Sequence, residues 1–277
     1  MLPHVLVHVL AKDKEPVMQF YLDCLAAQDY PKDRITLYIR TNNNNDKTAW
    51  IINDWLNKNE RNYKEVIYDA RDIDEPVHME SPHGWTEQRL CVIRRLRDAG
   101  LGMARDRNAD FYFTSDVDNF IVPSTLRKLV ELNLPAVAPL LRYAIDKTEK
   151  AENSRAANWM YSTFTNKVNE WGDTQHGAPE HTFPEGYFDI LHRLNVGVHP
   201  VELIHATYLL SRDVVDRISY QNGSWGGFDY IIFAYNLRQA GIQQYLDNRE
   251  VYGYMTLAEN INSVKSHMRR LTSVTGL

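Results

Sequence analysis

Two aspartates spaced one residue apart could hold a divalent cation. Asp116 and Asp118 follow Phe111–Thr114, an apolar run with the composition of a buried strand. Hard cations such as Mn²⁺ and Mg²⁺ prefer oxygen ligands, and two carboxylates can share such an ion with the oxygens of a diphosphate. An ion at this point would offset the charge that grows on a nucleoside diphosphate as it leaves a sugar. The same aspartates could instead only shape a turn, but their place after an apolar strand favours metal binding.

A third carboxylate, Asp229, is the candidate catalytic base. It follows Trp225, Gly226 and Gly227 and lies just before a run of helical periodicity. Glycines allow a backbone to approach a sugar closely, and the dipole of a helix keeps a carboxylate at its N-terminus ionised. Such a carboxylate can accept the proton of an attacking hydroxyl group, as an inverting displacement at the anomeric carbon requires. The alternative role of Asp229 is to cap the helix.

Imidazole and basic side chains late in the chain are weaker candidates. His267 is the available third metal ligand, in competition with Asn262 and with a plain role as a solvated helical histidine. The nearby Arg269 and Arg270 could instead contact a diphosphate. His205 lies between apolar residues of an expected strand, where a histidine usually has a structural role.

The elements that must position these residues alternate along the first half of the chain. Short apolar runs, typical of buried strands, alternate with segments whose apolar residues recur at helical spacing. This alternation favours an α/β fold with a mixed, mainly parallel sheet and helices on both faces. The expected strands are Val5–Leu10, Ile35–Ile39, Glu65–Tyr68, Phe111–Thr114, Ala136–Leu140 and Leu203–Ser211. The expected helices are Pro16–Ala27, Thr48–Leu56, Thr86–Arg105 with its arginines facing outward, Ser124–Leu132 capped by Ser124, and Phe228–Ala240.

Ligands of such sheets bind beyond the carboxyl ends of the strands, which directs attention to the loops there. Three of these loops are polar: Ala11–Glu15, Thr41–Thr48 and Ser115–Asn119. The segment Ala144–Leu191 is polar and lacks periodicity, as expected of a functional excursion. We expect it to become more ordered when a donor binds and to form an acceptor cleft with its aromatic residues, among them Trp159, Tyr161, Trp171 and Tyr187.

Length and composition are those of one folded domain with a substantial core. The chain has 277 residues, of which 44% are hydrophobic. We expect a single domain, 1–277, with a nucleotide-binding half at 1–141 and an acceptor-side half at 142–277. The formal net charge of −5 argues against a general nucleic-acid partner.

No apolar run approaches the ~20 residues that a membrane helix needs. The apolar start at Met1–Leu10 is too short and too uncharged for a signal peptide and is expected to be a first core strand. Cys24 and Cys91 fall in expected helices, where buried thiols are favoured over a disulfide. We therefore expect a soluble, cytoplasmic protein without a membrane span.

Several motifs, spread in one order over most of the chain, resemble the amino-terminal domain of procollagen galactosyltransferases. More distantly, they resemble the glycosyltransferase domain of lysyl hydroxylases. The motifs are Thr41–Thr48, Trp85–Arg89, Ala99–Asp110, Asp116–Asn119, Leu134–Leu141, Ile204–Thr207, Phe228–Ile232 and Tyr252–Tyr254. In addition, Trp225–Asp229 resembles the Trp-Gly-Gly-Glu-Asp sequence of many sugar transferases.

This resemblance implies a GT-A fold, in which a Rossmann-like sheet binds a UDP-sugar, normally together with Mn²⁺. It makes Asp116 and Asp118 the metal ligands, with Asp116 beside the donor, and Arg89 a phosphate contact rather than a surface charge. It places the uridine in a pocket formed by two loops, represented by Ala11, Lys12 and Asp13 and by Thr41 to Asp46.

Two departures from the resembling family stand out. Tyr230 replaces the second aspartate of the family's Phe-Asp-Asp sequence, which leaves open a non-catalytic module that binds a nucleotide-sugar or a partner. The family's luminal cysteines have no counterpart near Trp159 or Asn195, which fits a reducing cytosol.

The function expected from the sequence is transfer of a hexose, galactose or glucose, from a UDP-sugar to a hydroxyl acceptor. The expected cofactor is Mn²⁺ or Mg²⁺, the acceptor is a glycan or a hydroxylysine-type peptide, and a homodimer is left open. A nucleotidyltransferase shares the metal chemistry but would normally have a glycine-rich, basic loop after the first strand. Ala11–Lys14 contains no glycine.

Overall fold

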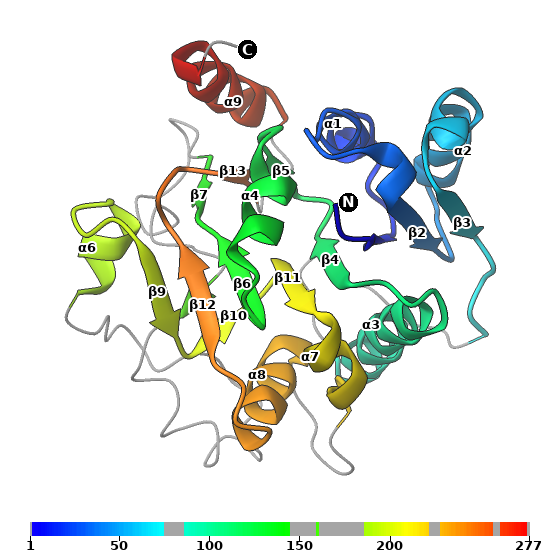
Figure 1. The fold of residues 1–277 in the computed structure, drawn as a ribbon. Coiled ribbons are helices and arrows are strands. Elements are labelled where there is room, and N and C mark those ends of the chain that lie inside the picture. Colours follow the sequence, from blue (N-terminus) through cyan, green and yellow to red (C-terminus); the bar gives the residue numbers. More distant parts are fainter. Residues whose placement is uncertain are drawn as a thin grey trace.

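A large mixed sheet forms the centre of the molecule. The computed structural model describes residues 2–74, 86–144, 159–160, 186–221, 228–256 and 261–275, and only the backbone of 159–160 and 272–275. The strands of the large sheet are β1 (Val5–Ala11), β2 (Ile35–Thr41), β3 (Glu65–Asp69), β4 (Phe111–Ser115), β6 (Ala136–Pro139), β9 (Val198–Val201), β11 (Thr207–Ser211) and β12 (Gln244–Asp247). Within these described ranges the sheet has eight strands, in the order β3-β2-β1-β4-β11-β6-β12-β9 (Figure 1).

The first four strands pair in parallel, and the rest of the sheet is mixed. β1 pairs with β2 and β4, and β2 with β3, all in parallel. β11 runs antiparallel to β4 and β6, whereas β12 is parallel to β6 and antiparallel to β9. This arrangement confirms the mixed, mainly parallel sheet. It also places the carboxyl ends of β1, β2 and β4 at one edge, where ligands of such sheets bind.

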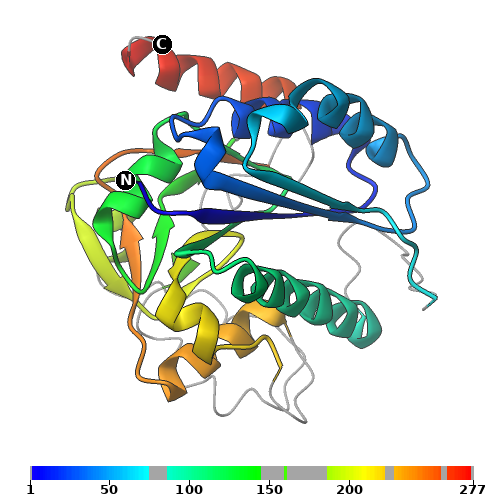
Figure 2. The ribbon, with the colours of Figure 1, turned by 45° about the vertical axis from the view of Figure 1, so that its right-hand side comes forward.

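Helices cover both faces of the sheet, as the alternating pattern predicts. Val5, Val7 and Val9 of β1 face one core and Leu6 faces the other, because successive side chains of a strand point to opposite faces. The first core is closed by α1 (Glu15–Ala26), α2 (Thr48–Asn59), α4 (Thr125–Leu132) and α9 (Ile261–Thr275). The second is closed by α3 (Glu87–Asp106), α6 (Tyr187–Leu191), α7 (Arg212–Arg217) and α8 (Asp229–Gln239). Figure 2 shows α3 on the side of the sheet opposite α1 and α2.

Smaller sheets complete the fold next to the acidic tip. β13 (Gly253–Met255) lies between β5 (Asn119–Ile121), which is antiparallel to it, and β7 (Leu141–Tyr143), which is parallel. β8 (Trp159–Met160) and β10 (Leu203–Ile204) form an antiparallel pair. Short 3₁₀ turns at Lys32–Arg34 and Glu60–Asn62 precede β2 and β3. Because β5 begins directly after Asp118, it fixes the chain on that side of the tip.

Two local predictions were wrong. Ser124 has helical backbone angles and makes no capping bond; the Oε1 atom of Gln28, two residues after α1, instead accepts a hydrogen bond from the Leu126 amide at 3.0 Å. The run Leu203–Ser211 is not one strand, because Ala206 has a φ of 63° between β10 and β11. A left-handed residue ends the extended backbone that a strand needs.

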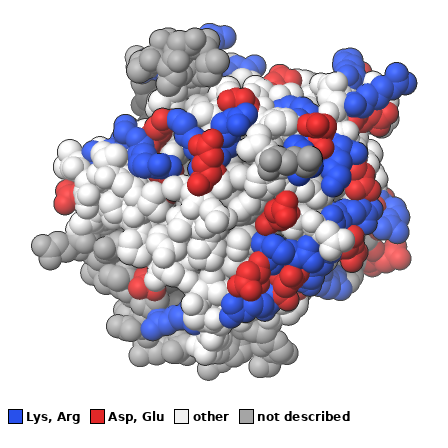
Figure 3. Space-filling model, viewed as in Figure 1, with Lys and Arg blue, Asp and Glu red and all other residues white. Residues whose placement is uncertain are grey.

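The described surface is mixed in charge. On the face shown in Figure 3, basic and acidic side chains lie interspersed rather than in separate patches. No helix in the described ranges is both long and apolar enough to cross a membrane. Both cysteines are free thiols; Cys24 is buried as expected, whereas Cys91 is only half-buried.

Candidate active site

The end of β4 delivers the acidic tip to the sheet edge, where neighbouring strands hold it. The Asn119 amide donates to the Asp116 carbonyl at 2.9 Å, which closes a turn. The Asp116 amide donates to the Ala206 carbonyl at 2.8 Å, and the Thr256 amide donates to the Asp118 carbonyl at 3.0 Å. With the backbone fixed in this way, the side chains of Asp116 and Asp118 remain 33% and 25% exposed. Both carboxylates are therefore held in place yet accessible to a ligand.

The acidic tip borders a pocket of about 270 Å³ that also contains Asp229. Asp229 is the first residue of α8 and is buried. The structure thus brings the two candidate metal ligands and the candidate base into one pocket. The wall beside Asp229 is aromatic, because Tyr230 packs against His205 and Phe228 with ring centroids 5.0 and 5.4 Å away. Aromatic faces of this kind suit the apolar face of a sugar.

Arg97 joins the two ends of this pocket. Its Nη2 atom donates to the two carboxylate oxygens of Asp116 at 3.0 and 3.3 Å, and its Nε atom lies 2.5 Å from Oδ2 of Asp229. Burial alone would lower the pKa of Arg97, but the carboxylates of Asp116 and Asp229 raise it well above its usual value. Arg97 is therefore a buried cation that two carboxylates hold in place.

Arg97 was not predicted as a site residue. The expectation that the arginines of this helix face outward was wrong for Arg94 and Arg97, although Arg95 is exposed as expected. Arg94 and Arg97 are only 5% and 8% exposed. A signal was present, because Arg97 lies seven residues after Leu90 and four before Leu101, both of which are buried. Residues at these separations share one face of a helix. The partners of Arg97 could not be foreseen, since they come from the turn after β4 and from the start of α8.

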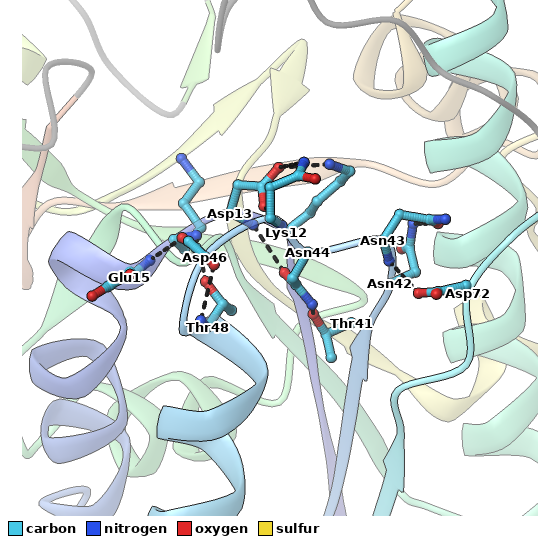
Figure 4. Close-up of polar contacts among 12 residues, drawn as sticks. Lys12, Asp13, Glu15, Thr41, Asn42, Asn43, Asn44, Asp46, Thr48 and Asp72 are labelled. Carbon is cyan, nitrogen blue, oxygen red and sulfur yellow. Dashed lines mark hydrogen bonds and ion pairs between the residues drawn. The ribbon is translucent and has the colours of Figure 1, made fainter.

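The loops after β1 and β2 bind each other, as Figure 4 shows. The Asp13 amide donates to Oδ1 of Asn44 at 3.0 Å, and the Asn45 amide donates to Oδ1 of Asp13 at 2.6 Å. Asn44 in turn donates to Oγ1 of Thr41 at 2.6 Å. Lys12 pairs with Asp13 at 2.6 Å. The predicted uridine residues of the two loops therefore lie together, in one network at the carboxyl edge of the sheet.

Asp46 has a visible structural role in this network (Figure 4). Its Oδ2 atom accepts a hydrogen bond from the Glu15 amide at 2.8 Å, and its Oδ1 atom accepts one from the Thr48 amide at 2.9 Å. Glu15 and Thr48 are the first residues of α1 and α2, whose amides have no partner within their own helices. Asp46 therefore stabilises the start of both helices.

Lys14 connects the two loops to the acidic tip. Its Nζ atom lies 3.7 Å from Oδ2 of Asp118, and its amide donates to Oγ1 of Thr48 at 2.6 Å. The predicted nucleotide loops and the predicted metal ligands are thus neighbours in space. The sequence analysis placed Lys14 in a loop of interest without assigning it a role.

Of the remaining residues predicted to bind the donor, those that the structure describes do not line the pocket. Ala11 and Thr41 are buried at the ends of β1 and β2. Arg89 is half-buried in the first turn of α3, one turn before Ile93, and is not among the residues that line the pocket. Trp225, Gly226 and Gly227 lie outside the described residues.

The structure does not place His267 in the pocket. Its Nδ1 atom shares a hydrogen bond with the Ser263 carbonyl at 2.8 Å, and its ring lies 4.9 Å from that of Tyr254. Within the described ranges no cluster of three or more His, Cys, Asp or Glu residues could hold a metal ion. A third protein ligand therefore remains a prediction.

The chemistry of Asp116 and Asp118 nevertheless fits Mn²⁺ or Mg²⁺. Such ions are commonly bound by one or two carboxylates, and waters and substrate phosphates complete the shell. Each carboxylate has several lone-pair sites, so the bonds of Asp116 to Arg97 leave it able to act as a ligand. The two partly exposed carboxylates would supply the protein ligands of the ion, and the oxygens of a diphosphate would complete its shell.

The predicted acceptor segment lies largely outside the described residues, including Tyr161 and Trp171. The backbone of Trp159 pairs with Ile204 in the small β8–β10 sheet. Tyr187 is buried in the second core, which gives it a packing role rather than a place on an open cleft.

Comparisons with known proteins show which family and which fold this chain is similar to. A family model described as glycosyltransferase family 25, N-terminal domain, matches residues 2–275. Human procollagen galactosyltransferase 2 is 35% identical over 266 residues, which cover 92% of this chain and 39% of that protein. A mouse protein named inactive glycosyltransferase 25 family member 3 is 31% identical over 268 residues, 92% of this chain and 41% of that protein. The chain thus spans about two fifths of the length of these relatives.

A solved structure shows the same fold at low sequence identity. Residues 1–349 of S. aureus TarS match with a TM-score of 0.53 and 14% identity, over 98% of this chain and 64% of that chain. Its complex with UDP matches with a TM-score of 0.51 and 15% identity, over 92% and 60% of the two chains. At this identity the likeness concerns the fold alone, which is the GT-A type that the sequence analysis expected.

Proposed function

The chain belongs to glycosyltransferase family 25, and from this premise we propose that it transfers a hexose from a UDP-sugar to a hydroxyl acceptor. Galactose is the favoured hexose, because relatives over most of the chain are named procollagen galactosyltransferases. UDP as the nucleotide is supported by the UDP complex of TarS, which shares the fold. A glycan or hydroxylysine-type peptide as acceptor, a homodimer and a cytoplasmic location remain parts of the proposal.

The observation that carries this proposal is the convergence of Asp116, Asp118 and Asp229 on one pocket. Bound Mn²⁺ or Mg²⁺ supplies positive charge that offsets the leaving diphosphate. Asp116 and Asp118 would hold that ion, and Lys14, 3.7 Å from Asp118, adds a positive charge at the same end. The pocket orients the sugar between this end and Asp229.

Asp229 is suited to accept the proton of the acceptor hydroxyl. Its Oδ2 atom faces Arg97 at 2.5 Å, which fixes the carboxylate and leaves Oδ1 for the acceptor. Transfer would then form a bond from the acceptor oxygen to the anomeric carbon and break the bond to the diphosphate. The hydroxyl proton moves to Asp229 as a general base.

The first prediction concerns turnover by Asp229→Asn. UDP release should be measured with a panel of UDP-hexoses, Mn²⁺ and hydroxylated acceptors. The variant should bind the donor but turn over at least ~10²-fold more slowly, because it lacks a proton acceptor. Asp213→Asn is the matched control, since that side chain is 75% exposed and, among the described residues, pairs with its helix neighbour Arg217 alone.

Three outcomes have distinct meanings. Loss of turnover in Asp229→Asn, but not in Asp213→Asn, supports Asp229 as the base. Equal turnover of Asp229→Asn and the unmodified protein shows that Asp229 has only a structural role at the start of the helix. Tight donor binding by the unmodified protein with no turnover on any acceptor favours a non-catalytic module. The family includes relatives named inactive, which makes this last outcome a specific alternative.

A further inference from the structure

In the part of the chain that the structure describes, Arg97 has a buried donor atom without a hydrogen-bond partner. The side chain is 9% exposed, and its Nη2 atom is bonded to Asp116. The Nη1 atom is buried and has no hydrogen-bond partner in the described part of the chain. The Nε atom lies close to Asp229 as an ion pair but lacks the alignment of a hydrogen bond. Buried N–H groups without an acceptor are unfavourable, and native proteins usually satisfy them with a ligand or water.

The position of Arg97 limits which ligand can satisfy it. The side chain lines the pocket and contacts Asp116 at one end and Asp229 at the other. If the proposed function holds, the diphosphate lies at the first end and the attacking hydroxyl at the second. The part of the substrate that lies between them is the sugar being transferred.

The charge around Arg97 favours a neutral acceptor over a phosphate. Its one positive charge faces the two carboxylates of Asp116 and Asp229, so this cluster has no excess positive charge to attract an anion. A sugar hydroxyl is neutral and has lone pairs that accept from a guanidinium N–H. A hydrogen bond with one charged partner is also stronger than one between neutral groups.

We propose that Arg97 donates a hydrogen bond to a hydroxyl oxygen of the transferred hexose. The same side chain positions Asp116 and Asp229 on either side of that sugar. This inference rests on the proposed function and deepens it, because it assigns recognition of the hexose, as distinct from recognition of UDP, to a residue of α3.

The test compares UDP and UDP-hexose binding in the presence of Mn²⁺, without an acceptor, by calorimetry. The ratio of the two affinities isolates the sugar contribution, since both ligands share the nucleoside, the diphosphate and the metal. Arg97→Lys keeps a positive charge between the carboxylates. However, lysine has one nitrogen donor where the guanidinium has three that point in fixed directions, so it cannot bond to Asp116, Asp229 and the sugar in the same way. The variant should reduce the preference for UDP-hexose over UDP at least about tenfold.

Arg94→Lys is the matched control. Arg94 is also buried on α3, but its Nη2 atom bonds to Glu87 and Cys91, and it does not line the pocket. This variant should keep the full preference for UDP-hexose. An unchanged preference in Arg97→Lys, or equal binding of UDP and UDP-hexose by the unmodified protein, overturns the inference.

A second measurement needs no variant and covers the case in which Arg97→Lys fails to fold. UDP-hexoses that lack one hydroxyl at a time are titrated into the unmodified protein, and one of them should bind at least about tenfold more weakly. If all deoxy donors bind like the parent, the inference fails while the proposed function stands. If the unmodified protein binds neither UDP nor UDP-hexose with Mn²⁺, the proposed function itself fails.

Discussion

At the scale of single residues, one glycine of α3 allows this helix to pack closely against β1. Gly100 lies against His8, and a Cβ atom built on it would come within 2.1 Å of Nδ1 of the histidine. That ring is fully buried, stacks on Tyr38 at 4.9 Å and shares a hydrogen bond with Tyr112 at 2.7 Å. Burial, together with the charge of Arg97, lowers the pKa of His8 to about 3, so the ring is neutral at physiological pH. The His8 ring, which lies against Gly100 of α3, therefore has little room to move.

Gly100→Ala should destabilise the fold by about 1–3 kcal/mol, because the new methyl group must displace a ring held on two sides. Gly102→Ala is the control on the same helix, since a Cβ there meets nothing within 4 Å. Alanine is the better helix former by about 1 kcal/mol, so this control should be neutral or stabilising. Urea unfolding measures both free energies. Equal stabilities of the two variants would contradict the close approach of α3 to β1.

At the scale of elements, the loops after β1 and β2 act as one unit because polar side chains of each bind the backbone of the other. Asp46→Ala removes the acceptor for the first amides of α1 and α2. It should lower the free energy of unfolding by about 1–2 kcal/mol, the usual effect of losing a helix cap. Asp54→Ala is the control, because the ion pair of Asp54 within the described ranges is an exposed one with Lys58 of the same helix. That control should change stability by less than about 0.5 kcal/mol, and a similar loss in both variants would remove the capping role.

The elements themselves were largely readable from local pattern. Apolar runs predicted β1, β2, β4 and β6 because strands buried on both faces leave little room for polar residues. β3 was predicted as well, although it is a half-buried strand at the edge of the sheet. The start of α4 was misjudged, since its cap comes from Gln28, which follows α1 and is far away in sequence. The break at Ala206 was also missed, because nothing local marks a left-handed alanine. Both errors concern features that depend on tertiary neighbours.

At the scale of the whole molecule, the site depends on contacts between the second half of the chain and the strands of the first half. β11 inserts antiparallel between β4 and β6, and its preceding residue Ala206 bonds to the Asp116 amide. α8 then brings Asp229 to the same pocket. Local sequence patterns singled out Asp116, Asp118 and Asp229 one by one, and the family resemblance pointed to the same residues. Their convergence and the link through Arg97 depend on strand order, which no short-range pattern encodes.

The most direct test of the account is calorimetric titration of UDP with and without Mn²⁺. The unmodified protein should bind UDP tightly only when the ion is present, because in the proposed function Asp116 and Asp118 hold the diphosphate through it. Asp118→Asn keeps the size of the side chain, removes its charge and should abolish the Mn²⁺ dependence while thermal unfolding stays cooperative. The Asp116→Asn variant should behave in the same way. UDP affinity and Mn²⁺ dependence equal to those of the unmodified protein in both variants would contradict the assignment of the metal site.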